Sequence, residues 1–223
     1  AANYIFPTAQ LKTEDVISTW AGLRPLIHED GKSPSDLSRK DEIFISESGL
    51  ISMAGGKLTG FRKMAERAVD TALKQLMMEK GLSYTFCTTE NVTLAGGDIS
   101  GEKTIAIFEN KLVKKYPKID ANSVISLTRK YGSNAIEILN NIAKYSDQKH
   151  GLLLAEIDYS IENEMCLSLG DFIVRRTGRL YFERPSLEEI YPIIHQHINS
   201  KLAISESNAS QDLEVFEKEY HAV

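Results

Sequence analysis

The 223-residue sequence has few cysteines and no long hydrophobic run. These two features argue against a disulfide-rich protein and against a membrane-spanning one. Cys87 and Cys166 lie far apart, which fits reduced thiols in a cytoplasmic protein better than a disulfide framework. No apolar segment approaches the ~20 residues that a membrane-spanning helix needs. The first residues do not form a signal peptide. The sequence therefore predicts a cytoplasmic protein and leaves open peripheral contact with the inner face of the cell membrane.

A basic surplus and a metal-ligand pattern are also lacking. The formal net charge is -5, whereas general nucleic-acid binding usually requires an excess of Lys and Arg. Neither cysteine has C-x-x-C spacing, and His195 and His197 would point about 160° apart on a helix. We therefore expect no nucleic-acid partner and no metal site, and we expect both histidines to be polar side chains at the surface.

The patterns along the chain indicate an α+β protein. Its hydrophobic content, 42% of the residues, is enough to form a globular core. Residues 15–25 carry β-branched and aromatic residues before Gly22 and Pro25, which predicts a strand that enters a turn. Residues 43–45 and 50–53 predict a β-hairpin. From Lys57 the pattern becomes helical, and Gly81 ends it. The apolar stripe of this helix, which we expect to pack on a sheet, is Leu58, Phe61, Ala65, Ala68 and Ala72.

Beyond a glycine-rich linker the periodicity is helical to the end. The predicted helices cover residues 105–116, 120–131, 133–145, 152–165, 171–176, 186–202 and 210–221, with Asp120 as one N-cap candidate. We therefore predict two domains. Residues 1–82 form a small β-hairpin and strand remnant with a long helix, and residues 83–223 form an all-α domain.

The first candidate site is the turn Gly55-Gly56-Lys57 between the hairpin and the long helix. The first amides of a helix lack internal partners and carry partial positive charge. Glycines allow close backbone approach, and Lys57 adds a full charge. Such a turn suits a phosphate or the electron-rich edge of a flavin ring, and it also fits a purely structural turn. Neither G-x-x-x-x-G-K nor G-x-G-x-x-G occurs in the chain.

The second candidate is Arg24, which lies between Leu23 and Pro25 on a predicted stiff turn. A guanidinium held in this way matches a carboxylate or phosphate through two parallel hydrogen bonds, although a structural ion pair is the plainer alternative. Arg39 precedes the hairpin and is a weaker candidate for a second anion contact.

Several segments together carry a resemblance to a known family. They are "TWAGLRPL", "DLSRKDEIFIS", "GLISMAGGKLTGFRKMAERAVD" and "LAGGDISG", followed by "KYGSNAIEIL" and "DFIVRRTGRLYF". In this order they resemble the C-terminal part of the FAD-dependent glycerol-3-phosphate dehydrogenases, which include the α-glycerophosphate oxidases. Many members have threonine where this chain has Gly60 and tyrosine where it has Phe61. The form present here resembles a Gram-positive type of the dehydrogenase.

The resemblance implies a role for each matching position. Arg24 would bind the phosphate of glycerol 3-phosphate with help from Arg39, and Lys57 would be the catalytic group near the reacting face of the flavin. FAD would take a hydride from C2 of the substrate, giving dihydroxyacetone phosphate, and would pass electrons to quinone. The residues expected to contact the flavin are Gly55, Gly56, Lys57, Leu58 and Thr59.

The same resemblance implies that the FAD-binding glycine motif and the catalytic base lie outside this chain. We therefore expect a fragment that neither holds FAD tightly nor turns over alone. Three alternatives stay open: an oxygen-using oxidase that produces hydrogen peroxide, an amino-acid oxidase, and a non-catalytic helical module that covers the FAD domain or self-associates. We also expect Arg175, Arg176 and Arg179 either to form an inter-helix ion-pair cluster or to dock onto a cap domain outside this chain. The residues that could supply acidic partners are Glu156, Asp158, Glu162 and Glu164.

Overall fold

The computed structural model describes residues 2–23, 41–99, 101, 103–145 and 149–222. It divides into two compact units, each considered by itself. The hairpin unit covers residues 22–94, and the helical unit covers residues 1–21 and 95–223. Most described residues are helical and two strands form a small sheet, so the predicted α+β class is confirmed.

The hairpin unit places a two-stranded sheet beside one long helix. Strands β1 (Asp41–Ile45) and β2 (Ile51–Gly55) pair antiparallel, with Asp41 opposite Gly55. Helix α2 (Phe61–Lys80) contacts β2, and an ion pair from Arg67 to Asp41 joins it to β1. The helix ends as predicted at Gly81, whose φ of 64° is left-handed and whose amide donates to Met77 O at 2.9 Å.

The apolar stripe of α2 is only partly covered. Ala68 and Ala72 are half-buried, whereas Leu58, Phe61 and Ala65 are exposed. The expected packing of the small residues on a sheet is therefore present in part, since α2 contacts β2 through its half-buried face and Ala65 stays exposed.

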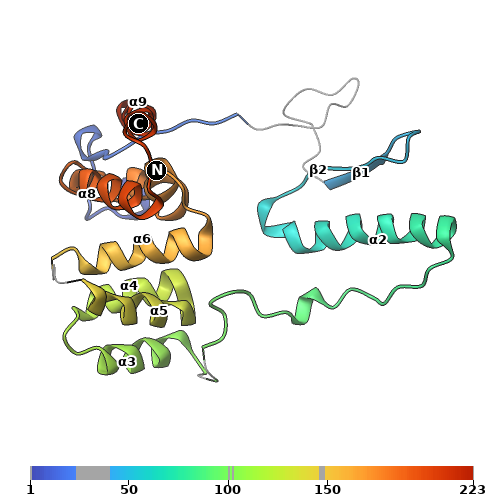
Figure 1. The fold of residues 1–223 in the computed structure, drawn as a ribbon, viewed down its shortest axis with the longest axis horizontal. Coiled ribbons are helices and arrows are strands. Elements are labelled where there is room, and N and C mark those ends of the chain that lie inside the picture. The colour runs from blue at the N-terminus through green and yellow to red at the C-terminus, as the bar shows by residue number, and fades with distance from the viewer. Residues whose placement is uncertain (1, 24–40, 100, 102, 146–148, 223) are drawn as a thin grey trace. The chain divides into compact units, whose positions relative to one another are not determined.

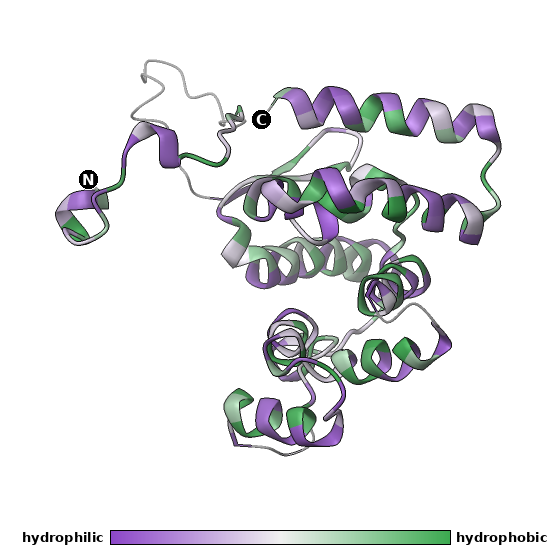
Figure 2. Cartoon of the chain, turned by 90° about the vertical axis from the view of Figure 1, so that its left-hand side faces the viewer, coloured by the Kyte–Doolittle hydropathy of each residue, from purple (hydrophilic) through white to green (hydrophobic). Residues whose placement is uncertain are grey.

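The helical unit is built from helices whose hydrophobic residues alternate with hydrophilic ones (Figure 2). Most of the predicted helices are confirmed within one or a few residues. Residues 133–145 instead form a seven-residue helix flanked by short 3-10 turns, and a π-helix covers Asp171–Arg176. The α-helices of this unit are α1 (Ala2–Ile5), α3 (Ile105–Lys115), α4 (Ala121–Tyr131), α5 (Ala135–Asn141), α6 (Gly151–Glu164), α7 (Arg179–Phe182), α8 (Arg184–Leu202) and α9 (Glu206–Ala222).

Helix α6 lies between two hydrophobic cores (Figure 1). On one side Ala155 and Tyr159 pack with α3, α4 and α5. On the other side Ile157 packs with the π-helix, α8 and α9. Seven of its residues are buried, six of them in the unbroken run from Ala155 to Ser160, which is the pattern of a helix covered all round.

Two carboxylates belong to that buried run, and the first is Glu156. Its Oε1 accepts hydrogen bonds from Lys130 Nζ at 3.0 Å and Tyr131 Oη at 2.9 Å, and its Oε2 accepts one from Arg179 at 2.8 Å. Burial alone raises the pKa of Glu156. The charges of Arg179 and Lys130 outweigh burial, so the pKa lies below its ordinary value. The expected pairing of Arg179 with Glu156 is present.

The second buried carboxylate is Asp158. It accepts hydrogen bonds from Tyr145 Oη and from His197 Nε2, the latter at 2.9 Å, and lies 3.3 Å from Lys201 Nζ. Burial raises the pKa of Asp158, but these three partners together lower it below its ordinary value. The prediction that His197 is merely a polar side chain at the surface is therefore wrong, since it binds a carboxylate on α6.

The segment before Leu23 does not form the predicted strand. Residues 16–23 have no regular secondary structure, and their contacts lie far away in the sequence. Ser18 Oγ donates to the carbonyl of Tyr181 at 2.9 Å, and Trp20 packs on Tyr181 with ring centroids 4.8 Å apart. The β-branched composition of this segment is overridden by its docking on α7.

Two glycines bring the linker and the end of α4 into contact. Gly132 has φ 58° and ψ -132°, and a Cβ there would lie 1.9 Å from the carbonyl oxygen of Gly96. That carbonyl accepts a hydrogen bond from Ser133 N at 2.9 Å. Only glycine fits at position 132, because any side chain would collide with rigid backbone.

We predict that Gly132→Ala lowers the free energy of unfolding by about 3 kcal/mol, through backbone strain and the collision with Gly96. Urea unfolding followed by circular dichroism measures the change. Gly101→Ala is the matched control, because Gly101 also has a positive φ of 74° but no atom within 4 Å of its Cβ position. Equal losses in the two variants would contradict the packing argument.

We predict that Glu156→Gln destabilises the chain by about 3 to 5 kcal/mol at neutral pH, because Lys130 and Arg179 then lose a buried countercharge. The folded-state pKa of Glu156 is lowered. Its contribution is therefore complete above the unfolded pKa of about 4.3 and is lost as the pH falls through the folded value.

Urea unfolding over a pH series tests this prediction. The gap between Glu156→Gln and the parent should narrow as the solution becomes acidic. Glu214→Gln is the control, since Glu214 is exposed and pairs with the exposed Lys218 on α9. A gap that stays constant with pH would contradict the assignment of the effect to an ionised Glu156.

Candidate functional site

The candidate site is the turn that joins β2 to α2. Gly55 and Gly56 have φ of 79° and 80°, so two consecutive residues adopt the left-handed conformation that favours glycine. Lys57 then returns to extended backbone and precedes a short 3-10 turn, Leu58–Gly60. The amide of Gly60 donates to Lys57 O at 2.8 Å. The chain thus reverses sharply before it enters α2.

Gly56 is also required by packing. A Cβ at this position would lie 2.7 Å from Met64 Sδ and 3.2 Å from Asp41 Cβ. Met64 belongs to α2 and Asp41 to β1, so the absent side chain lets the helix approach the hairpin. The fold therefore explains the glycine at position 56 whether or not a ligand binds there.

The start of α2 is electropositive. No acidic residue lies in its first turn, and neither Lys57 nor Gly60 supplies a side-chain cap at the two N-cap positions. Glu66, one turn further on, accepts from Lys63 at 2.7 Å and Arg62 at 2.9 Å. The hydrogen bond from Lys63 lowers the pKa of Glu66, and its negative charge is offset locally. The turn can therefore stabilise negative charge on a bound group.

The structure brings together the five residues predicted to contact a cofactor. Gly55, Gly56, Lys57, Leu58 and Thr59 are all exposed, and Leu58 exposes 89% of its surface. They present backbone amides, one ammonium group and one apolar side chain on a continuous stretch of surface. Such a set fits the edge and face of a planar, electron-rich ring. The predicted anion-binding residues Arg24 and Arg39 lie outside the described residues, as does His28.

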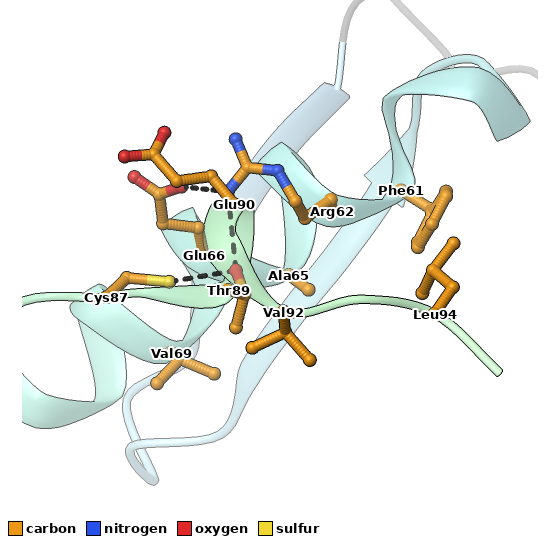
Figure 3. A pocket seen from close by; sticks show the side chains of 10 residues that line it. All are labelled: Phe61, Arg62, Ala65, Glu66, Val69, Cys87, Thr89, Glu90, Val92 and Leu94. Atoms are coloured by element: carbon orange, nitrogen blue, oxygen red, sulfur yellow. Dashed lines mark hydrogen bonds and ion pairs between the residues drawn. The ribbon is translucent and has the colours of Figure 1, made fainter. Parts of the chain in front are cut away.

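A groove of about 550 Å³ follows α2 from this turn (Figure 3). One wall is formed by Phe61, Ala65 and Val69, which are spaced one helical turn apart. The other is formed by the segment 87–94, whose Leu94 side chain points toward Phe61 in Figure 3. The groove is thus the uncovered part of the apolar stripe of α2.

Polar contacts hold one end of the groove. Thr89 Oγ1 lies 3.1 Å from Cys87 Sγ and accepts from Arg62 at 3.3 Å. Sequence reasoning treated residues 82–101 only as a linker and missed these contacts. The one local signal is the alternation of Val92 and Leu94, which places two apolar side chains on one side of an extended segment.

Two further observations concern the described part of the chain. It contains no cluster of three or more His, Cys, Asp or Glu side chains able to hold a metal ion. Among the same residues, no helix combines the length and the apolar character needed to cross a membrane.

Comparison with known proteins supplies a family. The family profile described as the C-terminal domain of alpha-glycerophosphate oxidase matches residues 87–209, which is more than half of the chain. An aerobic glycerol-3-phosphate dehydrogenase of Staphylococcus epidermidis is 48% identical over 187 residues, which cover 82% of this chain and 34% of that protein. The protein of the same name from Staphylococcus aureus is 46% identical over 187 residues. The chain thus matches about a third of the length of these relatives.

A solved structure is similar over nearly the whole chain. It is the crystal structure of the glycerol-3-phosphate dehydrogenase from Bacillus halodurans in complex with FAD, with a TM-score of 0.79 and 37% identity. The match covers 99% of this chain and 42% of that one. The resemblance read from the sequence motifs is confirmed, and the chain belongs to the family of the C-terminal domain of alpha-glycerophosphate oxidase.

Proposed function

We propose that this chain is the C-terminal part of a flavoenzyme that oxidises sn-glycerol 3-phosphate to dihydroxyacetone phosphate. The observation that carries the proposal is the structural likeness, over 99% of the chain, to a glycerol-3-phosphate dehydrogenase in complex with FAD. The relatives named aerobic glycerol-3-phosphate dehydrogenase support the same reaction. Because they are much longer, catalysis would require the whole enzyme, and the chain alone would be inactive.

The turn after β2 fits FAD on chemical grounds. It offers exposed amides at two left-handed glycines, an exposed ammonium group and no acidic side chain in the following helical turn. When bound, FAD supplies the acceptor for the hydride that leaves C2 of glycerol 3-phosphate. Lys57 and the amides of residues 55–59 would hold the ring edge and stabilise the negative charge that builds there. Leu58 would contact the apolar face of the ring.

Arg24 and Arg39 would bind the substrate. Arg24 would hold the phosphate through paired hydrogen bonds, which fixes the distance of C2 from the hydride acceptor. Arg39 would add a second positive charge to the same phosphate. These roles are carried by the resemblance of "TWAGLRPL" and "DLSRKDEIFIS" to the family.

The proposed reaction assigns different roles to the two parts of the chain. Residues 1–82 would complete the FAD and substrate domain, and residues 83–223 would form a separate helical domain. The compact units differ from this division, because residues 1–21 group with residues 95–223 and residues 83–94 group with the hairpin. The helical unit has two hydrophobic cores of its own, which supports a fold that holds together without a flavin. Covering the flavin domain, or pairing with a second copy, would be its role in the whole enzyme.

In the full-length enzyme, we predict that Arg24→Gln raises KM for glycerol 3-phosphate about 100-fold, because a charged phosphate contact is lost. Lys57→Met should instead lower kcat about 10- to 100-fold with a small change in KM. Steady-state kinetics separate the two effects.

Two control variants should change neither constant. Lys80→Met lies at the exposed end of α2, and Arg175→Gln removes an exposed guanidinium paired with Asp171. Unchanged kinetics in Arg24→Gln and Lys57→Met would contradict the roles proposed for these two residues.

The electron acceptor is the remaining choice. The relatives are named dehydrogenases, whereas the family profile is named for an oxidase. We propose the dehydrogenase, with quinone as the acceptor. We predict that the full-length enzyme reduces a soluble quinone analogue at least about tenfold faster than it forms hydrogen peroxide in air-saturated buffer. A quinone is lipid-soluble, so this choice would also bring a cytoplasmic enzyme to the membrane surface. Stoichiometric peroxide would assign the oxidase instead.

A further inference from the structure

One ion pair joins the start of the hairpin to α2 beside the turn that follows β2. Arg67, on the second turn of α2, donates a hydrogen bond to the carboxylate of Asp41, the first residue of β1. Asp41 lies opposite Gly55 in the sheet, so its backbone is next to the first residue of the candidate site. The ion pair therefore connects α2 to the end of the sheet from which the turn departs.

The side chains around this ion pair lie against the turn itself. The Cβ atom of Asp41 is 3.2 Å from the position that a Cβ would take at Gly56, and Met64 Sδ is 2.7 Å from the same position. Met64 and Arg67 are three residues apart, which places them on one side of α2. Both side chains thus reach the hairpin from the same side of the helix, one at the turn and one at the carboxylate.

These contacts fix both ends of the turn. The chain leaves Gly55, reverses and enters α2 as far as Arg67, and the ion pair returns it to the strand partner of Gly55. The two left-handed glycines lie within this closed segment. Glycine has more backbone freedom than any other residue, so consecutive glycines need constraints from the flanking elements to keep one conformation. The ion pair is such a constraint.

The exposure of the ion pair limits the size of its effect. The side chain of Arg67 is 49% exposed and that of Asp41 is 27% exposed. Partly exposed pairs contribute little to global stability, so a substitution at either position should leave the protein folded. Their influence on the turn has the same upper bound, which corresponds to a factor of about five in an equilibrium constant.

We propose that Arg67 and Asp41 are positioning residues that hold the turn after β2 in the arrangement that binds reduced FAD. This inference rests on the proposed function, because it requires the turn to face the flavin. The pair would act through the backbone of residues 55–59 and through the ammonium group of Lys57, which would stabilise the negative charge of the reduced ring. Loss of the pair would therefore weaken the binding of reduced FAD more than that of oxidised FAD.

The test is the midpoint potential of bound FAD in the full-length enzyme, measured by reductive titration without substrate. We expect Arg67→Met to weaken the binding of reduced relative to oxidised FAD about fivefold, which lowers the potential by about 20 mV for a two-electron couple. Arg67→Lys keeps a cation near Asp41 and should restore most of the difference. Lys74→Met is the control, because it removes an exposed cation two turns further along the same side of α2, and it should leave the potential unchanged.

Asp41→Ala separates positioning from a direct effect of charge. Removal of a negative charge near the turn would by itself favour reduced flavin and raise the potential. If the ion pair positions the turn, Asp41→Ala instead lowers the potential, as Arg67→Met does, and the double variant lowers it no further. An unchanged potential in Arg67→Met, a rise in Asp41→Ala, or losses that add in the double variant would each overturn the proposal.

Lys57→Met distinguishes a failure of this inference from a failure of the proposed function. It should lower the potential if the turn faces the flavin. A fall in Lys57→Met without a fall in Arg67→Met and Asp41→Ala would keep the flavin contact and refute the positioning role. An unchanged potential in all three variants would refute the contact between the turn and FAD, and the positioning role with it.

Discussion

The helical unit depends on how two charged residues are buried in its central helix. Glu156 and Asp158 are two positions apart on α6, so their side chains leave the helix in nearly opposite directions. Glu156 binds partners from α4 and α7, and Asp158 binds partners from α8 and the segment before α6. Replacing such pairs with apolar residues would cost little, but losing one partner alone is expensive. The two carboxylates therefore define which side of α6 meets which core.

The turn after β2 combines a folding requirement with an exposed, electropositive surface. Gly56 has no side chain because Met64 and Asp41 occupy the space, and the same left-handed backbone leaves the neighbouring amides exposed. The approach of α2 to the hairpin and the electropositive surface at the turn thus have one cause. Substituting either glycine would disturb the packing of α2 and the exposed surface together. Substituting Lys57, whose side chain is exposed, would change the charge of the surface and leave the packing intact.

Sequence periodicity predicted the elements well because each depends on neighbours close in the chain. The hairpin, the end of α2 at Gly81 and the Asp120 cap of α4 are local features, and all are present. Contacts between distant residues were harder to predict. Trp20 lies 161 positions before Tyr181, on which it packs, and its segment was predicted as a strand from composition alone.

Polar contacts between residues that are distant in the sequence were equally hard to predict. The sequence predicted that Arg179 could pair with one of four acidic residues, and the structure selects Glu156. The bond from His197 to Asp158 spans 39 residues, and nothing in the local sequence indicates that one member is buried. At the candidate site, the contiguous residues 55–59 could be identified from their motif, whereas the groove along α2 depends on how segment 87–94 returns to the helix.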